Sequence, residues 1–408
     1  MIPKGWSSQK LSSVASIIDC KHRTPEYVKS GIPLVSPGTI KWGALDLISP
    51  VKRVTEEEYR SLMDHCVVEQ GDLVMSRNQS VGVVSYVDSK KPFVLGQDTV
   101  LIKAIHADWR FIYYTLQSDL VQRQIAKSAG GSTFSRINLS DIRALNIKTP
   151  AICEQDKISQ ILTAWDKAIS VTESLLANSQ QQKKALMQQL LTGNKRLLDE
   201  NGVRFSGEWK ITKLIQMGKV VSGGTPDTNM AMYWEGDILW LTPTDVTALT
   251  GRFVSNTSRK ITPAGLLNSS AVLLPKGSLM VCTRATIGAL AISTSEICTN
   301  QGFKNIIPNE GFNIEFIYYL LQMNTNEMIK KSSGSTFLEL SKKDFETLSF
   351  SCPFIKEQQK IAAVLSAADT EISTLEKKLA CLKDEKKALM QQLLTGKRRV
   401  KVDEAVAV

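Results

Sequence analysis

Two stretches of the chain carry apolar residues at the alternating three- and four-residue spacing of a heptad, uninterrupted by proline or glycine until Gly193 and Gly396. This spacing predicts two long helices, over residues 151–193 and 353–396, each with an apolar seam that needs a partner helix. The seam of the first helix consists of Ile158, Leu162, Trp165, Ile169, Thr172, Leu176, Ser179, Leu186 and Leu190. The seam of the second consists of Ile361, Leu365, Ala368, Ile372, Leu375, Leu379, Leu382, Leu389 and Leu393, with one gap at Lys386. Both glycines stand where the left-handed residue that ends a helix is expected.

Helices of this length can bury their seams in two ways. Each would be about 60 Å long at 1.5 Å per residue. An antiparallel pair would bury both seams and create a pseudo-twofold axis, whereas the alternative is that each helix folds back on its own domain. We expect the pair, because the apolar stripe is too long for one small domain to cover.

The segments before each long helix have a different, mixed character. Short β-rich runs such as "DLVMS", "VGVVSYV", "SLMVC" and "GALAIS" are separated by clusters of Gly, Pro, Asn and Ser. One helix is predicted in each segment, over Trp109–Lys127 and Ile314–Lys331. The expected fold class is therefore α+β, with two tandem α/β domains separated by two long, antiparallel, coiled-coil-like helices.

The whole chain is one unit written twice. "KKALMQQLLTG" occurs as Lys183–Gly193 and as Lys386–Gly396, and "EQDKISQILTAWDKAI" lies over "EQQKIAAVLSAADTEI" at the same offset. "GSTF", "FIYY" and "TP" also recur in order. A period of about 200 residues indicates tandem domains, since solenoid repeats run at about 20–50 residues. The expected divisions are a first domain at 1–150, a central helix at 151–193, a linker at 194–204, a second domain at 205–352, a second helix at 353–396 and a basic tail at 397–408.

Composition narrows the class of protein. Hydrophobic residues make up 43% of the chain, and no apolar run approaches the roughly 18 residues of a membrane span. The start, "MIPKGWSSQK", lacks the apolar core of a signal peptide, and the seven scattered cysteines fit reduced thiols. We therefore expect a cytoplasmic protein with no membrane partner. The formal net charge of +10 points to a polyanionic partner, most often nucleic acid.

Motifs for catalysis are missing from the sequence. There is no GxGxxG or GxxxxGK[ST] phosphate loop. The three histidines, His22, His65 and His106, all lie in the first repeat and have no equivalents in the second. The acidic run Glu56–Glu58 is typical of a solvated helix start. The sequence thus predicts no catalytic site, no metal site and no cofactor in this chain.

The ordered motifs resemble those of the specificity subunits of type I restriction–modification systems. The resemblance covers essentially the full chain and rests on "SGGTPDTNMAMYWEGDILWLTPTDV", "NQGF", "PFIKEQQKIAAVL", the heptad helices and their "LLTG" ends, with most features present twice. It implies two target-recognition domains that each read one half of a split double-stranded DNA site. It also implies helices that separate these domains and dock two methylation subunits, with restriction subunits joining that core. S-adenosylmethionine, ATP and Mg²⁺ are expected in the partner subunits.

The loops of the mixed domains supply candidates for DNA contact. Arg and Lys read guanine in the major groove, Asn and Gln read adenine, and many other contacts go to phosphates. For any one residue a solvated surface role is the alternative, and Phe134 and Phe337 are expected to be packing residues. The candidates in the first domain are Lys21, Arg23, Lys41, Arg77, Asn78, Gln79, Gln97, Thr133 and Arg136. Those in the second are Thr225, Thr244, Asp245, Arg284, Thr286, Gln301, Lys304 and Thr336. Loop differences such as "KHRTP" against "SGGTP" predict two different half-sites.

The identical phrase at the helix ends fits identical docking surfaces for two identical partners. Helix propensity alone explains a helix but not identity at exposed positions, whereas recent duplication or gene conversion would explain identity without function. The docking candidates are Lys183, Lys184, Gln188, Gln189, Lys386, Lys387, Gln391 and Gln392. The rival hypothesis is a tandem coiled-coil adaptor without a nucleic-acid role, and a stand-alone nuclease or methyltransferase comes third.

Overall fold

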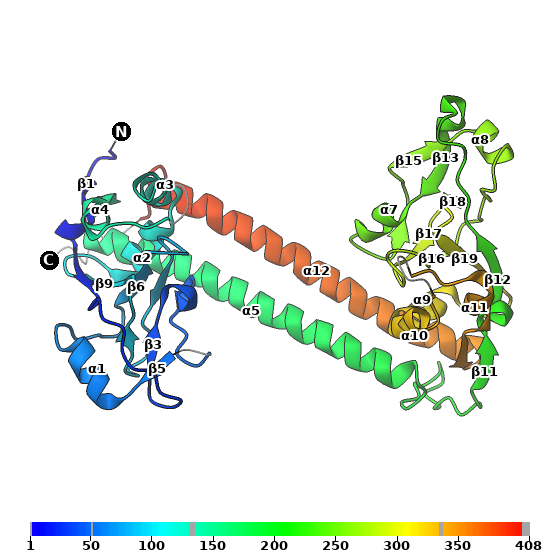
Figure 1. The fold of residues 1–408 in the computed structure, drawn as a ribbon, viewed down its shortest axis with the longest axis horizontal. Coiled ribbons are helices and arrows are strands. Elements are labelled where there is room, and N and C mark those ends of the chain that lie inside the picture. Colours follow the sequence, from blue (N-terminus) through cyan, green and yellow to red (C-terminus); the bar gives the residue numbers. More distant parts are fainter. Residues whose placement is uncertain (1, 50–51, 131–134, 334–337, 402–408) are drawn as a thin grey trace. The chain divides into compact units, whose positions relative to one another are not determined.

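The computed structural model describes residues 2–49, 52–130, 135–333 and 338–401. The chain divides into two compact units (Figure 1). Unit 1 consists of Met1–Thr172 with Lys378–Val408, and unit 2 consists of Glu173–Lys377. Each unit therefore combines one mixed domain with the start of one long helix and the end of the other. Among the described residues, no helix has the length and apolar character needed to cross a bilayer.

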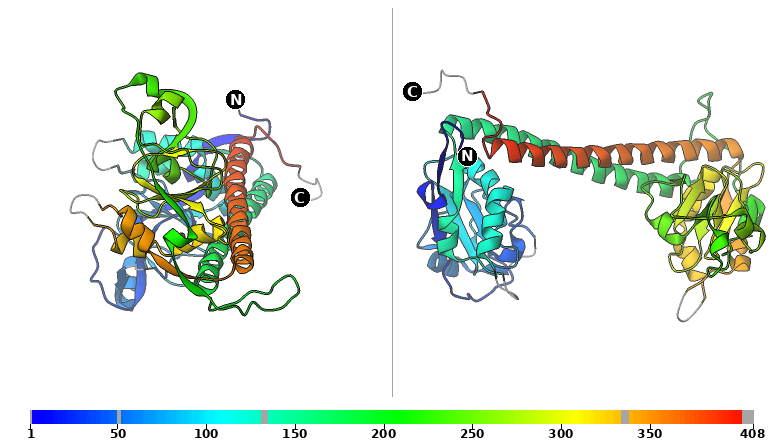
Figure 2. Two further views of the ribbon diagram at one scale, coloured as in Figure 1. Left: turned by 90° about the vertical axis from the view of Figure 1, so that its right-hand side faces the viewer. Right: turned by 90° about the horizontal axis from the view of Figure 1, so that it is seen from above.

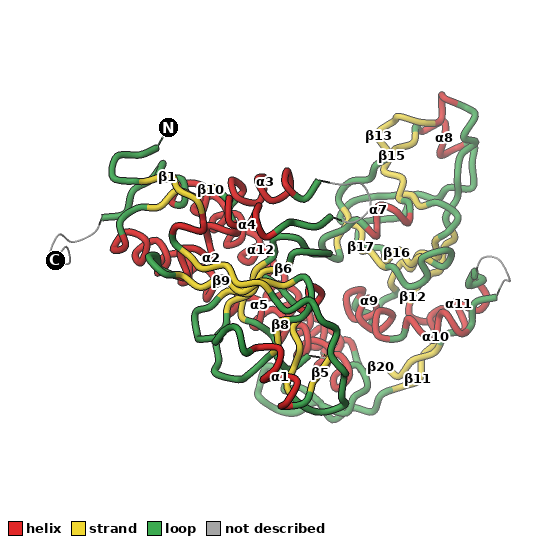
Figure 3. Tube along the Cα trace, turned by 60° about the vertical axis from the view of Figure 1, so that its left-hand side comes forward, coloured by secondary structure: helices red, strands yellow, loops and turns green. Residues whose placement is uncertain are grey.

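Unit 1 is built on three sheets. The five-stranded sheet has the order β2 (Ala15–Asp19), β9 (Thr99–Ala104), β6 (Leu73–Ser76), β7 (Val84–Tyr86) and β4 (Gly43–Ala44). The three-stranded sheet has the order β5 (Lys52–Val54), β3 (Ile32–Val35) and β8 (Val94–Leu95), and β1 (Ser7–Lys10) pairs with β10 (Asn146–Thr149). Pairs β3–β8 and β4–β7 are parallel and the others antiparallel. Figure 3 shows β6 and β9 side by side.

The central strands of this sheet are buried on both faces. In β6, Leu73 and Met75 enter the core that the helices cover, whereas Val74 enters a second core shared with the three-stranded sheet. Successive side chains of a strand point to opposite faces. This is why runs such as "DLVMS" are continuously apolar rather than alternating.

Unit 2 repeats the same topology strand for strand. Its five-stranded order is β12 (Gly218–Ser222), β19 (Phe303–Pro308), β16 (Leu279–Cys282), β17 (Leu290–Ser293) and β14 (Phe253–Val254). Its three-stranded order is β15 (Arg259–Ile261), β13 (Trp234–Leu241) and β18 (Cys298–Thr299), and β11 (Lys210–Lys213) pairs with β20 (Ser349–Cys352). The tandem repeat predicted from the sequence is confirmed.

Each single helix predicted before the "GSTF" motif is in fact two helices. In unit 1 these are α2 (Trp109–Gln117) and α3 (Asp119–Ser128). Ser118 has extended backbone angles, so it ends the first helix, and its hydroxyl accepts a hydrogen bond from the N–H of Val121 at the start of the second. In unit 2, Asn324 separates α9 (Ile314–Met323) from α10 (Thr325–Lys330).

Short helices complete both units. They are η1 (Leu11–Ser13), η2 (Pro37–Thr39), α1 (Glu56–Met63) and α4 (Leu139–Ala144) in unit 1, and α6 (Leu214–Met217), η3 (Ala231–Tyr233), α7 (Pro243–Thr247), α8 (Pro263–Leu267) and α11 (Lys342–Thr347) in unit 2. The Glu56–Glu58 run forms the first turn of α1, as its interpretation as a helix start predicts.

The two long helices are confirmed, with 39 residues each. They are α5 (Ile152–Leu190) and α12 (Ile355–Leu393). Gly193 and Gly396 have φ of +75° and +71°, so both occupy the left-handed region predicted for the helix ends. A Cβ on Gly193 would lie 3.4 Å from the ring of Trp209, and one on Gly396 would lie 2.5 Å from Pro3. Gly396 thus also allows a close approach by the start of a mixed domain, whereas a Cβ on Gly193 would make an ordinary contact.

Within each unit the two helices run antiparallel and also pack on the mixed domain. In unit 1 the start of α5 lies beside the end of α12 (Figure 2). Ile158 and Leu162 of α5 share one core there with Leu393 of α12. In unit 2, Ile361 and Leu365 share a core with Leu190. The seams at the helix ends therefore pack both on the other long helix and on the mixed domain. All predicted seam residues are buried or half-buried: Ile158, Leu162, Trp165, Ile169, Thr172, Leu176, Ser179, Leu186, Leu190, Ile361, Leu365, Ala368, Ile372, Leu375, Leu379, Leu382, Leu389 and Leu393.

Candidate nucleic-acid interface and docking face

One edge of the five-stranded sheet gathers the candidate loops of unit 1. The antiparallel register places Ser76, at the end of β6, opposite Thr99, at the start of β9, and Asp19, at the end of β2, opposite Val100. The loops that follow β2 and β6 and precede β9 therefore meet at this edge. We call it the recognition edge.

Arg77 lies at this edge but does not reach the surface. Its side chain is 6% exposed, its Nη1 lies 2.7 Å from Asp19 Oδ1, and its Nε donates to the carbonyl of Ile137. A direct contact of Arg77 with DNA is therefore not supported by its burial. The guanidinium instead fixes the loop that carries the next two candidates.

Asn78, Gln79, Gln97 and Arg136 are grouped at the recognition edge around Asp98. Arg136 forms an ion pair of 2.8 Å with Asp98, and Asn78 lies 3.4 Å from the same carboxylate. Gln79 is exposed and has φ of 61°, and Gln97 donates to the hydroxyl of Thr24. The edge thus offers amide and guanidinium donors on a hydrogen-bonded frame.

The three remaining cationic candidates of unit 1 differ in their contacts. Lys21 forms an ion pair of 2.6 Å with Asp64, and Arg23 pairs with both oxygens of Glu58 on α1. The hydrogen bond from Arg23 lowers the pKa of Glu58, so the carboxylate stays charged. The Lys41 side chain is exposed, while its backbone is tied to Ser85. Of these three, Lys41 is the one whose side chain forms no ion pair with a described residue.

Unit 2 has the same recognition edge with different side chains. The Thr225 hydroxyl donates to the amide oxygen of Gln301, which joins the loop after β12 to the loop before β19. Arg284 and Thr286 follow β16 and are exposed. Arg284 bridges by its backbone to Glu339. The structure therefore brings these four candidates together.

Two further candidates of unit 2, Lys304 and Asp245, are buried or hydrogen-bonded within the unit. Lys304 is 6% exposed, and burial lowers the pKa of its ammonium group. Burial alone would raise the pKa of Asp245, but hydrogen bonds from Thr242 and Ser258 outweigh it and hold the pKa below its ordinary range. Asp245 forms the capping box of α7 with Thr242, so it lies in a short helix rather than in a loop, and its role in DNA contact stays a prediction. Thr244, on the same helix, is exposed.

Thr133 and Thr336, with Phe134 and Phe337, lie outside the described residues. Their assignment as contact or packing residues stays a prediction.

The first lysine of the repeated phrase is committed to an internal cluster in both units. Lys386 Nζ lies 2.5 Å from Asp166 Oδ1, and the Tyr114 hydroxyl donates to Asp166 Oδ2 at 2.7 Å. Lys183 and Tyr319 bind Asp369 in the same way, both at 2.5 Å. Lys183 and Lys386 are 16% and 14% exposed. Both lysines therefore have a structural role, and their docking role stays a prediction.

Burial raises the pKa of both cluster tyrosines, Tyr114 and Tyr319, and the adjacent aspartate adds to the shift. Each phenol therefore stays protonated at neutral pH and can donate to its carboxylate. The cluster was missed in the sequence, although the tyrosine, aspartate and lysine recur in both repeats. Polar identities between otherwise divergent repeats were the available signal.

The Glu-Gln pair that starts each long helix also has a structural role. The Glu154 carboxylate binds Arg399 through two hydrogen bonds, of 2.7 and 2.8 Å, and the Gln155 side chain bonds to Pro150 and Asp108. In unit 2, Glu357 binds Arg196 in the same way, at 2.6 and 2.7 Å. These contacts explain why the residues recur.

The rest of the repeated phrase forms an exposed face. Its leucines and Met187 or Met390 point into the unit cores. The exposed members are Lys184, Gln188, Gln189, Lys387, Gln391 and Gln392. Within the part of the chain that the structure describes, no packing contact accounts for identity at all of these exposed positions. We call the two sets the docking faces.

Comparisons with known proteins agree with this architecture. Residues 3–178 and 206–383 match the family model of the type I restriction modification DNA specificity domain. A stretch of 172 residues is 40% identical to the type I restriction enzyme MjaIX specificity subunit of Methanocaldococcus jannaschii, covering 42% of this chain and 40% of that relative. The putative MjaX specificity subunit of the same organism is 25% identical over 426 residues, covering 98% of this chain and 95% of that relative.

A solved structure shares the fold. The S subunit of a type I restriction–modification system from M. genitalium superposes with a TM-score of 0.61 at 18% identity, covering 97% of this chain and 99% of that one.

Proposed function

Because the chain belongs to the family of type I restriction–modification DNA specificity domains, we propose that it is the non-catalytic subunit that gives such a complex its DNA sequence specificity. Each unit reads one half of an asymmetric, bipartite site in double-stranded DNA. The long helices set the distance between the halves and dock two methylation subunits, and restriction subunits join that core. S-adenosylmethionine, ATP and Mg²⁺ bind to those partners.

One observation carries this proposal: the two units keep one topology and one helix-end phrase while their recognition edges differ. Asn78, Gln79 and Arg136 in unit 1 face a different task from Thr225, Arg284 and Gln301 in unit 2. Amide and guanidinium groups of this kind read base edges, and phosphate contacts position the protein. Two different half-sites require different edges, whereas two copies of one partner require the same docking face.

The test is methylome sequencing of cells that express this chain with its methylation partner. Cells with the partner alone serve as the control. The proposal predicts a single split motif that depends on this gene. Replacing residues 10–148 with another domain of the family should change one half of the motif and keep the other, and a change in both halves would contradict the proposal.

Binding measurements separate the proposal from the adaptor hypothesis. A protein that contacts phosphates loses DNA affinity steeply as salt rises. An adaptor without a nucleic-acid role shows no such binding. Methyl transfer to DNA by the purified chain alone would contradict the non-catalytic assignment.

A further inference from the structure

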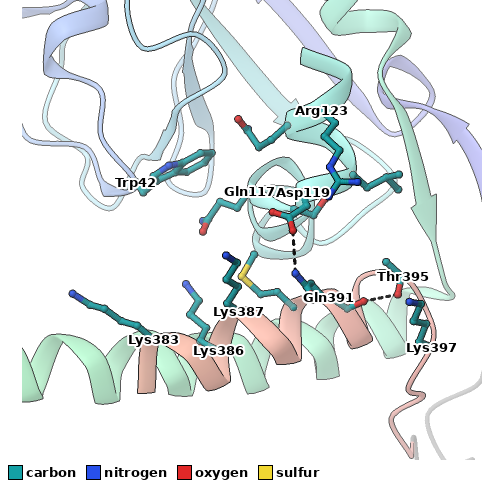
Figure 4. A pocket seen from close by; sticks show the side chains of 14 residues that line it. Trp42, Gln117, Asp119, Arg123, Lys383, Lys386, Lys387, Gln391, Thr395 and Lys397 are labelled. Carbon is teal, nitrogen blue, oxygen red and sulfur yellow. Dashed lines mark hydrogen bonds between the residues drawn. The ribbon is translucent and has the colours of Figure 1, made fainter. Parts of the chain in front are cut away.

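A groove in unit 1 lies where the corner between α2 and α3 faces the end of α12. Its volume is about 520 Å³. Figure 4 shows Lys386, Lys387 and Gln391 directed from α12 toward the segment that carries Gln117 and Asp119, with Trp42 across the opening. Gln391 donates to Asp119 at 3.0 Å and joins the two walls.

The groove has an excess of positive charge. Five cationic side chains line it and only one carboxylate, that of Asp119. Lys386 is already paired with Asp166. Arg123, Lys387 and Lys397 are exposed and form no ion pair with any residue that the structure describes. An anionic group that enters the groove would therefore meet three cations that are not paired with any described carboxylate, and Asp119 would be its one acidic neighbour among the lining residues.

The groove also has an apolar part that is open to solvent. Trp42 is 41% exposed and Leu120 is 42% exposed, and Met390 lies half-buried between the cations. The Trp42 ring is held by an edge contact with Tyr113, with ring centroids 6.2 Å apart. Tryptophan, methionine and arginine are enriched in protein–protein interfaces.

We propose that this groove docks an acidic segment of a protein partner, with a large apolar side chain of that segment seated against Trp42 and Leu120. The mixture of charge and apolar surface favours this occupant over DNA. A phosphate backbone would use the cations but leave the indole and the leucine in contact with water, whereas an acidic segment with an apolar anchor covers both.

The groove makes the two docking faces unequal. Lys183–Gly193 and Lys386–Gly396 are identical, but Lys397 and Lys383 correspond to Asn194 and Gln180 in the first repeat. The copy at the end of α12 therefore has two additional lysines that line the groove, while Asp384 and Glu385, which replace Gln181 and Gln182, are not among the residues that line it. The proposal rests on the docking part of the proposed function. It adds that the methylation subunit at the end of α12 makes a contact with the groove that the sequence at the end of α5 does not favour.

The test is binding of a fluorescent peptide to the full chain, followed by anisotropy. The probe is a peptide of glutamate and aspartate with one central phenylalanine. The double variant Lys387→Glu with Lys397→Glu should bind at least about tenfold more weakly, because it reverses two exposed charges. Trp42→Ala and Leu120→Ser should each weaken binding several-fold. Lys184→Glu, at the counterpart of Lys387, is the matched control and should leave binding unchanged. Circular dichroism checks that all variants fold.

Three results would overturn the proposal. They are no saturable binding of the probe to the wild-type chain, loss in the Lys184→Glu control equal to that in the double variant, and binding unaffected by Trp42→Ala and Leu120→Ser. A random DNA duplex that binds more tightly than the peptide and depends on the same residues would assign the groove to DNA instead and also overturn it. Methylomes of the same variants separate the two proposals. An intact split motif in cells whose chain fails to bind the peptide would contradict only the docking role of the groove. A wild-type chain that directs no motif would contradict the proposed function itself.

Discussion

The two units fasten a mixed domain to the long helices through the same tyrosine, aspartate and lysine, but unit 2 adds an arginine to this cluster. Arg252 directly precedes β14, and its guanidinium lies 2.7 Å from Glu315 and 3.5 Å from Asp369. It also bonds to Ser366 and stacks over Phe253 and Tyr319. In unit 1 the residue directly before β4 is Trp42, which makes an edge contact with Tyr113.

The two repeats diverged in only one part of this cluster. The contacts of the tyrosine and the lysine with the aspartate were kept, since both aspartates bind the same two partners. The contact made by the residue directly before β4 or β14 changed from an apolar one in unit 1 to a charged one in unit 2. Each domain is therefore attached by a shared tyrosine–aspartate–lysine cluster and by one additional contact that differs, made by Trp42 in unit 1 and Arg252 in unit 2. This is expected if recognition domains change while the helices do not.

Removing the shared aspartate should have the largest effect, and a larger one in unit 2. Asp369→Ala leaves Lys183, Arg252 and Tyr319 without their common acceptor and should cost about 3–4 kcal/mol of local stability. Asp166→Ala leaves only Lys386 without its acceptor, since the Tyr114 hydroxyl keeps its hydrogen bond with Thr163, and should cost about 2 kcal/mol. Hydrogen exchange of the helix ends in each unit measures both. The exposed Asp237→Ala serves as a control without effect. Equal losses in the two units would contradict the comparison.

Removing the additional contact in each unit should distinguish the charged contact of Arg252 from the apolar contact of Trp42. Arg252→Ala should destabilise unit 2 by about 2 kcal/mol, because it leaves a half-buried Glu315 unpaired. Trp42→Ala should cost unit 1 about 1 kcal/mol, since the ring is partly exposed and loses one aromatic contact. Denaturation at low and high salt checks the distinction: the Arg252 effect should shrink with salt, and the Trp42 effect should not.

A smaller contrast lies in the turn that ends the central strand of each three-stranded sheet. In unit 1 the backbone N–H of Ser36 donates to the Thr39 hydroxyl at 3.0 Å, whereas in unit 2 that of Thr242 donates to the Asp245 carboxylate at 2.8 Å. Only the second turn contains a titratable acceptor. Because the folded pKa of Asp245 lies below its unfolded value of about 3.9, its stabilisation is present above that pH.

This stabilisation should be lost as pH falls from about 4 through the lowered folded pKa. Asp245→Asn removes the titration and should cost about 1 kcal/mol at neutral pH, and less in acid. The pH dependence of amide exchange in α7, compared between wild type and variant, measures it. A variant whose deficit stays constant down to pH 2 would show that the carboxylate charge is not involved.

The sequence predicted the elements that have a local signal. The heptad stripe gave both long helices within three residues at each end, and the glycines gave their left-handed ends. The breaks at Ser118 and Asn324 were missed, because the apolar pattern continues across them and a capping side chain acts only once the turn has formed. Strand runs such as Leu73–Ser76 were found because they are apolar on both faces.

Side-chain roles that depend on distant contacts were not predictable from pattern. Arg77 directly follows β6 and Lys304 is the second residue of β19, and a cationic residue at such a position gives no local sign that it is buried. Lys386 is instructive, since the sequence showed it as the one gap in an apolar seam. A lysine in a seam needs a buried acceptor, and Asp166 supplies it. Position in the seam was thus better evidence than identity in the repeat.

The most direct test of the central claim is the spacing of the two half-sites after the first long helix is lengthened. The exposed run Gln180–Gln182 follows Ser179, which is bonded to Glu371, and is the place for a four-residue insertion. Four residues add about 6 Å, or at most about two base pairs of B-DNA at about 34 Å per helical turn. The insertion also breaks the heptad phase, so some loss of stability should accompany it. Methylome sequencing should show both half-sites unchanged and a spacer longer by one or two base pairs. An active mutant with an unchanged spacer would contradict the account.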